Sequence, residues 1–295
     1  MVENLVAGRP KATSYEYGIV AQEKMLKYYR KSKIPSASNH EYMRVVLAHD
    51  LIKRWALPRL SNKEPHEITV VDVGCSIGLF AIEFAKQGYN SYGIDFDSAA
   101  IEIARKLNEE ENASAQFMQM DVADWSYKFQ PIDIAICFDL FEHLHDDELG
   151  AMFYALKRQL SKNGCIVFHT LPQKYDYLFW NGKKGIVQFP PLLRPFINLR
   201  SSRFSRIVEI YALMRDIISL CKGSVTHKKA IKKADHPNPL TTERLGDILE
   251  RAGYEVLEMK TGFLGEIQVD SRHRAQFLKQ PVTHRSIYGV TAPRK

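Results

Sequence analysis

The chain of 295 residues carries a formal net charge of +7, with 25% charged and 45% hydrophobic residues. These values are typical of a globular protein with one large core and exclude a fibrous or low-complexity chain. Four separated cysteines form no CxxC pair and no metal-ligand spacing, and no apolar run approaches the roughly 20 residues that span a bilayer. The first residues lack a signal-peptide pattern, so a reducing, cytoplasmic setting is expected.

Residues 1–67 are predicted to form an N-terminal helical cap. Helices are expected over 15–31 and 41–57, the second with an apolar stripe and ended by Pro58. Two interpretations of these helices stay open. They either pack together as a structural pair or cover a ligand site at the edge of the following domain.

Strands alternate with helices from Ile68 onward, which predicts an α/β fold with a doubly wound, mostly parallel sheet. Residues 68–172 form the first part of this core and 241–295 its C-terminal part. In such a sheet a ligand lies at the carboxyl ends of the strands. The expected strands are 68–73, 91–94, 116–120, 132–137, 165–170, 254–260 and 286–291, and the expected helices are 79–87, 98–108, 146–160 and 243–252.

Residues 173–240 interrupt this alternation and are predicted to be an inserted lid. The segment holds 13 Lys/Arg against 4 Asp/Glu, and it contains an apolar helix expected over 204–220. That helix is either buried in the lid or forms an interfacial helix or a tunnel for a hydrophobic substrate. The cations are either solvated or contact an anionic acceptor. Nucleic acid is not expected, because no recognition module accompanies the basic run.

Acidic residues and glycines follow four successive predicted strands, the fourth of which leads into Phe138–Leu144. Asp72-x-Gly74-Cys75-x-x-Gly78 forms a glycine turn between a buried strand and a helix, where a ligand can approach the backbone closely. An acid about 20 residues past such a turn, here Asp95, can accept from both ribose hydroxyls. Asp121 can accept from an adenine amino group while the Val122 N–H meets a ring nitrogen. Each acid alone is typical of a cap or turn, and their common register favours a ligand site.

These motifs together resemble the class I S-adenosylmethionine-dependent methyltransferases, in particular the branch with a Glu-His-Leu or Glu-His-Val loop after the fourth strand, such as the quinone-biosynthesis O-methyltransferases. The resemblance implies a Rossmann-like sheet of seven strands with an antiparallel last strand inserted between the fifth and sixth. Ser76, in place of the usual middle glycine, and Asn163 depart from the pattern. The matching segments are Asp72–Gly78, Gly93–Asp95, Asp121, Glu142–Leu144 and Leu160–Gly164.

S-adenosylmethionine is the cofactor that the resemblance implies. Phe80 occupies the place where a nicotinamide dehydrogenase would need a third glycine, which argues against that alternative. The implied cofactor contacts are Gly74, Cys75 and Gly78 beneath the methionine part, Asp72 near its amino group, Asp95 at the ribose, Phe96 flanking the adenine, Asp121 and Val122 at the adenine edge, and Phe138 on the sulfonium side.

The expected reaction is methyl transfer to a small-molecule or lipid-like acceptor, at oxygen. An oxygen acceptor must lose its proton, which suits a histidine. His143 and His169 are the candidate bases, with His145 a third choice, although His143 could simply begin a helix and His169 could be a core residue. Two alternatives stay open: a regulatory protein that binds the cofactor without turnover, and a membrane-surface methyltransferase that acts on an anionic lipid-linked substrate through 173–240.

Overall fold

The fold of the chain comes from a computed structural model. The helical, strand and loop segments below all belong to the part of the chain that this structure describes. Nearly all of the predicted lid, residues 173–240, lies outside that part, including the helix expected over 204–220. The described residues are 19–36, 39–122, 125, 129, 131–171, 180–181, 185–186, 238, 240–262 and 286–294.

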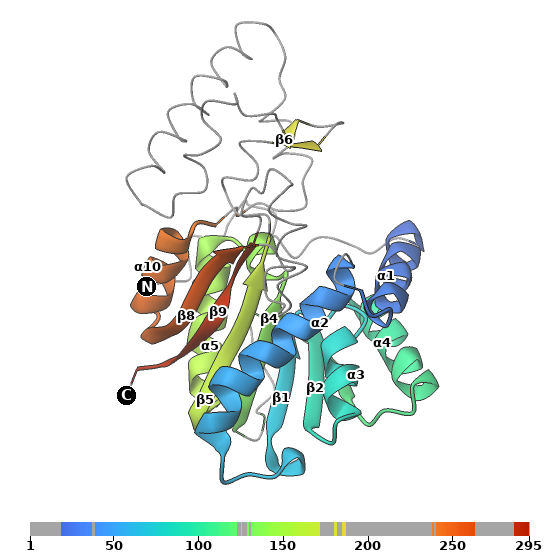
Figure 1. Cartoon of the computed structure of the whole chain (residues 1–295), viewed down its shortest axis with the longest axis horizontal. Coiled ribbons are helices and arrows are strands. Elements are labelled where there is room, and N and C mark those ends of the chain that lie inside the picture. The colour runs from blue at the N-terminus through green and yellow to red at the C-terminus, as the bar shows by residue number, and fades with distance from the viewer. Residues whose placement is uncertain are drawn as a thin grey trace, which may run out of the picture.

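One seven-stranded sheet forms the centre of the molecule (Figure 1), in the order β3-β2-β1-β4-β5-β9-β8. The first five strands in this order, β3, β2, β1, β4 and β5, run parallel to one another. The last strand of the chain, β9, lies between β5 and β8 and is antiparallel to both. The expected sheet, including the inserted antiparallel last strand, is therefore confirmed. The strands are β1 (Thr69–Val73), β2 (Asn90–Asp95), β3 (Gln116–Gln119), β4 (Ile132–Phe138), β5 (Leu160–Thr170), β8 (Tyr254–Gly262) and β9 (Ser286–Pro293), and a separate pair is β6 (Trp180–Asn181) and β7 (Gly185–Ile186).

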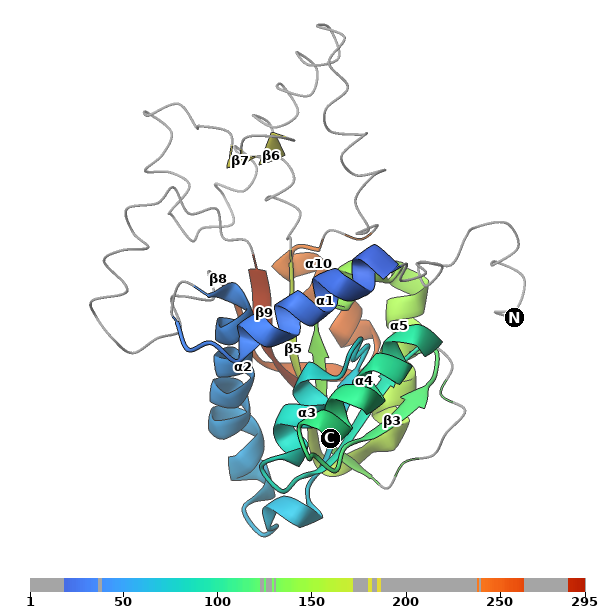
Figure 2. The same cartoon turned by 90° about the vertical axis from the view of Figure 1, so that its right-hand side faces the viewer.

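Helices cover both faces of the sheet, so that the protein has three layers (Figures 1 and 2). On one face lie α2, α3 and α4, with α1 packed on α3 and α4 through Tyr29. On the other face lie α5 and α10. The helices are α1 (Ile19–Ser32), α2 (His40–Leu51), α3 (Leu79–Ala85), α4 (Ser98–Glu110), α5 (Asp146–Gln159) and α10 (Thr242–Arg251), with single turns η1 (Ile52–Ala56), η2 (Leu57–Leu60), η3 (Pro65–Glu67) and η4 (Phe141–His143).

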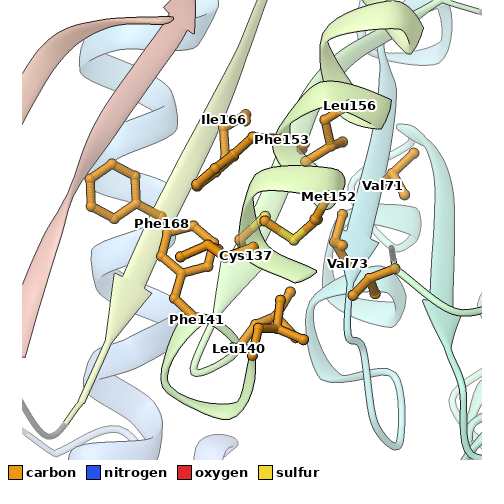
Figure 3. Packing of buried hydrophobic residues seen from close by; sticks show 14 of the residues in the cluster. Val71, Val73, Cys137, Leu140, Phe141, Met152, Phe153, Leu156, Ile166 and Phe168 are labelled. Carbon is orange, nitrogen blue, oxygen red and sulfur yellow. The ribbon is translucent and has the colours of Figure 1, made fainter. Parts of the chain in front are cut away.

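The alternation of side chains along the central strands divides the core into two layers. Val71 of β1 belongs to the layer that contains the buried residues of α5 and α10, whereas its neighbour Val70 belongs to the layer of α2 and α3. Figure 3 shows the first of these layers, in which Met152 and Phe153 of α5 lie against β4 and β5. Every residue of β1 and β4 is buried, as expected of parallel strands covered on both faces.

The chain reverses its direction across the sheet between β1 and β4. From β1 it proceeds through β2 to the β3 edge, and it then returns to β4 on the other side of β1. In open α/β sheets, ligands bind at the carboxyl ends of the strands beside such a reversal. The turn after β1 and the ends of β2, β4 and β5 therefore define the edge to inspect, called here the ligand edge.

Two of the differences from the expected element boundaries have a clear physical reason. Pro58 does not end the second helix: α2 passes into a π turn and then into a 3-10 turn that contains Pro58. Proline fits there because the first positions of a helical turn need no N–H donor. Asn163 and Gly164 do not precede the fifth strand but lie within β5, where a Cβ on Gly164 would come 2.7 Å from the Ile132 carbonyl oxygen. None of the helices in the described ranges is long and apolar enough to cross a membrane.

Candidate functional site

The glycine turn after β1 is held against the end of β2. The backbone N–H groups of Gly74 and Cys75 both donate to the Ile94 carbonyl oxygen at 2.9 Å. Gly74 and Gly78 have φ values of +71° and +84°, a left-handed conformation that costs glycine little. Gly78 also caps α3. Burial raises the pKa of the Cys75 thiol well above its usual range. The thiol is therefore neutral and contributes packing to the turn but no charge.

Ser76, which stands where the family usually has glycine, also adopts a left-handed conformation, with φ of +48°. Its backbone N–H donates to Asp95 Oδ2 at 2.7 Å, which ties the glycine turn to the end of β2. The Ser76 hydroxyl oxygen is buried and has no hydrogen-bond partner within the described residues. A buried hydroxyl without a partner is costly, and a polar ligand at this turn would satisfy it.

Asp95 ends β2 and is buried, with an exposed fraction of 6%. Its Oδ1 accepts from the Asp97 N–H at 3.0 Å, and its Oδ2 accepts from Ser76. Each carboxylate oxygen keeps a second lone pair that can accept from a hydroxyl. Burial raises the pKa of Asp95 to about 6, against these hydrogen bonds, which lower it. Asp97 caps α4 through the N–H groups of Ala99 and Ala100 and so has a structural role.

Asp72 lies at the end of β1, with an exposed fraction of 2%. Its Oδ2 accepts from the Ala81 N–H of α3 at 3.3 Å. Burial raises the pKa of Asp72 to about 7, while this hydrogen bond and the charge of Arg44 lower it. A carboxylate desolvated in this way gains strongly from a ligand cation such as an ammonium group.

The three candidate residues for the adenine lie beyond β2 and β3. Phe96 follows Asp95 directly, and its carbonyl oxygen accepts from Gln119 of β3. Asp121 and Val122 follow Met120, whose N–H donates to the Asp95 carbonyl oxygen at 2.8 Å. The structure therefore brings this group beside the proposed ribose acid.

Phe138 and His169 lie side by side at the ends of β4 and β5, as register partners. Their ring centroids are 5.5 Å apart, and the Phe138 ring also contacts Phe80 of α3 at 4.8 Å. His169 is completely buried, and its Nδ1 lies 2.6 Å from Asp139 Oδ1. The core-residue interpretation of His169 is thus incomplete, because its ring is hydrogen-bonded to a carboxylate at the ligand edge.

The sequence reasoning missed Arg44 of α2. Its Nη2 lies 2.6 Å from Asp139 Oδ2, its Nη1 lies 3.0 Å from Glu41 Oε2, and its guanidinium lies 5.9 Å from the Phe80 ring centroid. These contacts favour the interpretation in which the N-terminal helices cover the ligand edge. The available signal was an arginine inside the apolar stripe of this helix, a position that needs a partner when buried.

The Glu-His-Leu loop has a different role at each residue. Glu142 is buried, and its carboxyl group accepts from the Thr170 hydroxyl at 2.6 Å and the Leu171 N–H at 3.4 Å. Burial and the nearby Asp139 raise the pKa of Glu142 well above its usual range. His143 lies half-buried in η4, while His145 precedes α5 and its N–H donates to Glu148. Glu142 therefore ties the β4 loop to the end of β5.

Glycines, carboxylates and aromatic rings thus converge on one edge, with a guanidinium beside them. No group of three or more His, Cys, Asp or Glu side chains within the described ranges could hold a metal ion. This site and the sheet order define a class I methyltransferase fold, whose cofactor is S-adenosylmethionine.

Comparison with known families agrees with that class. The family model described as "Methyltransferase domain" matches residues 41–259. The chain belongs to this family of S-adenosylmethionine-dependent methyltransferases.

Relatives and solved structures extend the comparison. A ubiquinone biosynthesis O-methyltransferase of Alkalilimnicola ehrlichii is 28% identical over 137 residues, which are 43% of this chain and 55% of that protein. Its counterpart in Rickettsia conorii is 26% identical over 184 residues, 57% of this chain and 61% of that protein. The matches therefore span less than two thirds of these relatives.

Two solved structures share the fold over nearly the whole chain. A magnesium protoporphyrin IX methyltransferase from Synechocystis with bound SAH has a TM-score of 0.54 at 14% identity, covering 94% of this chain and 96% of that one. An S-adenosylmethionine-dependent methyltransferase from Clostridium acetobutylicum has a TM-score of 0.55 at 11% identity, covering 93% and 99%.

Proposed function

We propose that this protein transfers a methyl group from S-adenosylmethionine to a hydroxyl oxygen of a small-molecule or lipid-like acceptor. The observation that carries the proposal is the connection between the glycine turn and Asp95 through the Ser76 N–H, at 2.7 Å. This hydrogen bond holds the Asp95 carboxylate, which would accept from the ribose hydroxyls, against the glycine turn, where a ligand can approach the backbone closely. The family assignment and the names of the relatives support the reaction and the oxygen acceptor.

The residues of the ligand edge fit the parts of this cofactor. Asp72 suits the ammonium group, and the Arg44 guanidinium suits the carboxylate of the same amino-acid part. The unpartnered Ser76 hydroxyl offers one further hydrogen bond there. Asp95 suits the ribose and Asp121 the adenine amino group, while the Phe138 ring presents a π face to the sulfonium. When bound, the cofactor supplies an electrophilic methyl group.

The proton of the acceptor is assigned to His169 in this proposal. Methyl transfer forms an O–CH3 bond, breaks an S–CH3 bond, and leaves the hydroxyl proton to be taken up by a base. His169 is supported by its place beside Phe138 and its hydrogen bond to Asp139. His143, in the turn η4 after β4, stays the second candidate.

The remaining features of the proposal concern the setting. A small, lipid-like acceptor follows from the relatives' role in ubiquinone biosynthesis. A cytoplasmic location is supported by the free thiols of Cys75, Cys137 and Cys165. An anionic acceptor and a membrane contact depend on 173–240, nearly all of which lies outside the described residues.

Isotope transfer tests the reaction. The full-length protein is incubated with trideuteromethyl S-adenosylmethionine and a small-molecule extract of cells that lack the protein, and the products are analysed by mass spectrometry. We expect one acceptor to gain a labelled methyl group on oxygen, with one S-adenosylhomocysteine released per label. The Asp95→Ala variant, which loses the ribose acceptor, is the matched control and should transfer much less label at a cofactor concentration near the dissociation constant of the wild type. Cofactor binding without any labelled product would instead favour the regulatory alternative.

A further inference from the structure

We propose that Asp139 is a positioning residue for His169: held by Arg44, it fixes the imidazole in the tautomer that carries the proton on Nδ1. This inference rests on the proposed role of His169 as the proton acceptor and deepens it. A base that takes a proton through Nε2 must have its proton on Nδ1 beforehand. The contacts of Asp139 are arranged to impose that state.

Two hydrogen bonds join Asp139 and His169. The Asp139 backbone N–H donates to the His169 carbonyl oxygen at 2.8 Å, and the side chains meet at 2.6 Å between Oδ1 and Nδ1. An ionised carboxylate can only accept, so Nδ1 must donate and the lone pair of the neutral ring is on Nε2. The two bonds fix both the position and the rotation of the imidazole.

The backbone of Asp139 is strained in a way that this pairing explains. Its φ is +53°, a left-handed conformation that costs most residues with a Cβ about 1–2 kcal/mol and that aspartate adopts more readily than most. Strained residues of this kind gather at functional sites, where the surroundings hold them in place. Here the strain turns the carboxylate away from the direction of β4 and toward the end of β5.

Arg44 occupies the second oxygen of Asp139, with 2.6 Å between Nη2 and Oδ2. A guanidinium has only donors, so the atom that faces it must be an acceptor. Other charged groups near the pair are Glu41, bound to Arg44, Glu142, whose pKa is raised by burial and by the charge of Asp139, and Asp72, whose pKa burial raises while the charge of Arg44 lowers it. With Arg44 donating to Oδ2, Asp139 presents Oδ1 to His169 as an acceptor.

This chemistry predicts a specific effect of Asp139→Asn. The oxygen of the new amide must face Arg44, so its NH2 group faces His169 Nδ1. Nδ1 then has to accept, and the ring proton moves to Nε2, where the base function is lost. Because aspartate and asparagine are nearly equal in size, a change of tautomer would come from the replacement of an acceptor by a donor and not from altered packing.

Asp133 offers a matched control near the start of β4, the strand that Asp139 follows. It is completely buried, and it accepts from Lys63 Nζ at 2.7 Å, from the Thr69 N–H at 3.0 Å and from the Ser161 hydroxyl at 2.7 Å. Asp133→Asn makes the same chemical change at another buried aspartate, whose partners Lys63, Thr69 and Ser161 include no histidine.

The tautomer is measured on the full-length protein with ¹⁵N-labelled histidine rings, by long-range ¹H–¹⁵N correlation without any ligand. The His169 signals are assigned by their loss in His169→Gln. We expect a protonated Nδ1 and an unprotonated Nε2 in the wild type and in Asp133→Asn, and the reverse in Asp139→Asn.

A wild-type spectrum with the proton of His169 on Nε2 would overturn the inference, and it needs no Asp139 variant to fold. An unchanged tautomer in a folded Asp139→Asn would overturn it as well. Because the spectrum is recorded without cofactor, failure of the proposed function would show separately, as absent binding of S-adenosylmethionine in calorimetry.

Discussion

The glycine turn allows a sharp test, because the chain offers two glycines in the same conformation and different surroundings. Gly78 in the turn has φ of +84°, and Gly88 after α3 has φ of +85°. A Cβ on Gly78 would lie 2.6 Å from Phe117 Cε1 and 3.1 Å from the Ala104 Cβ, whereas a Cβ on Gly88 would meet nothing within 4 Å. Gly78→Ala and Gly88→Ala thus both force alanine into a left-handed conformation, but only Gly78→Ala also brings the new Cβ into steric overlap with its neighbours.

The Phe117 ring is buried, and a Cβ at Gly93 would also lie 2.6 Å from its Cε1 atom. The ring therefore fills space that both glycines leave, and a new methyl group at Gly78 would have to displace it. The left-handed conformation costs alanine about 1–2 kcal/mol, and overpacking adds about 1–3 kcal/mol. We therefore expect Gly78→Ala to lower the free energy of unfolding by about 2–5 kcal/mol and Gly88→Ala by only about 1–2 kcal/mol.

Urea denaturation of both variants measures the difference at an unchanged m-value. Calorimetry should show that Gly78→Ala also weakens S-adenosylmethionine at least about tenfold, since a shift of 1.4 kcal/mol is enough for that factor, while Gly88→Ala binds as the wild type does. Equal destabilisation of the two variants would refute the close-packing argument. Unaltered cofactor binding in Gly78→Ala would refute the placement of the ligand at this turn.

Two further predictions concern buried acids. Because the pKa values of Asp95 and Asp72 are raised to about 6 and about 7, both hold protons in acid, and the affinity for the cationic cofactor should rise with pH through this window, by up to about tenfold per pH unit for each proton released. Calorimetry at pH values from about 5.5 to about 8 spans the pKa values of both acids, and an affinity that stays constant over this range would contradict the prediction. Asp72→Asn should remove the part of the rise in affinity that occurs near pH 7. Because the pKa of Glu142 is raised in the folded protein, the folded protein keeps a proton on this acid that the unfolded chain has already lost. The stability of the wild type should therefore fall as the pH rises above the pKa that Glu142 has in the unfolded chain. Glu142→Gln should be as stable as the wild type in acid and more stable in alkaline solution by thermal unfolding, and parallel curves would contradict the buried state of this acid.

Much of the sheet could be predicted because its signals are local. The β-branched run before Asp72 marks a strand buried on both faces, and the glycines after it mark a turn. The place of Asp95 then follows from the rule that parallel strands end at one edge. For the same reason the ends of the fourth and fifth strands were expected near the ligand.

The contacts of Arg44 and Asp139 could not be predicted in this way. Their ion pair joins a helix before the sheet to the end of its fourth strand, and no periodicity links such distant positions. The left-handed backbone of Asp139 likewise arises from its contacts and not from a glycine in the sequence. Boundaries failed where tertiary contacts override local preference, as at Gly164, whose place within β5 is set by the close approach of Ile132.

The central claim is that the ligand edge binds S-adenosylmethionine through Asp95. Isothermal titration of S-adenosylmethionine into the wild type and into Asp95→Ala tests it most directly, with folding checked by circular dichroism. We predict one site per chain in the wild type and a loss of affinity of at least about tenfold in the variant, because removing a buried carboxylate acceptor costs about 1.5–3 kcal/mol. No binding by the wild type, or equal affinity in the two proteins, would contradict the claim.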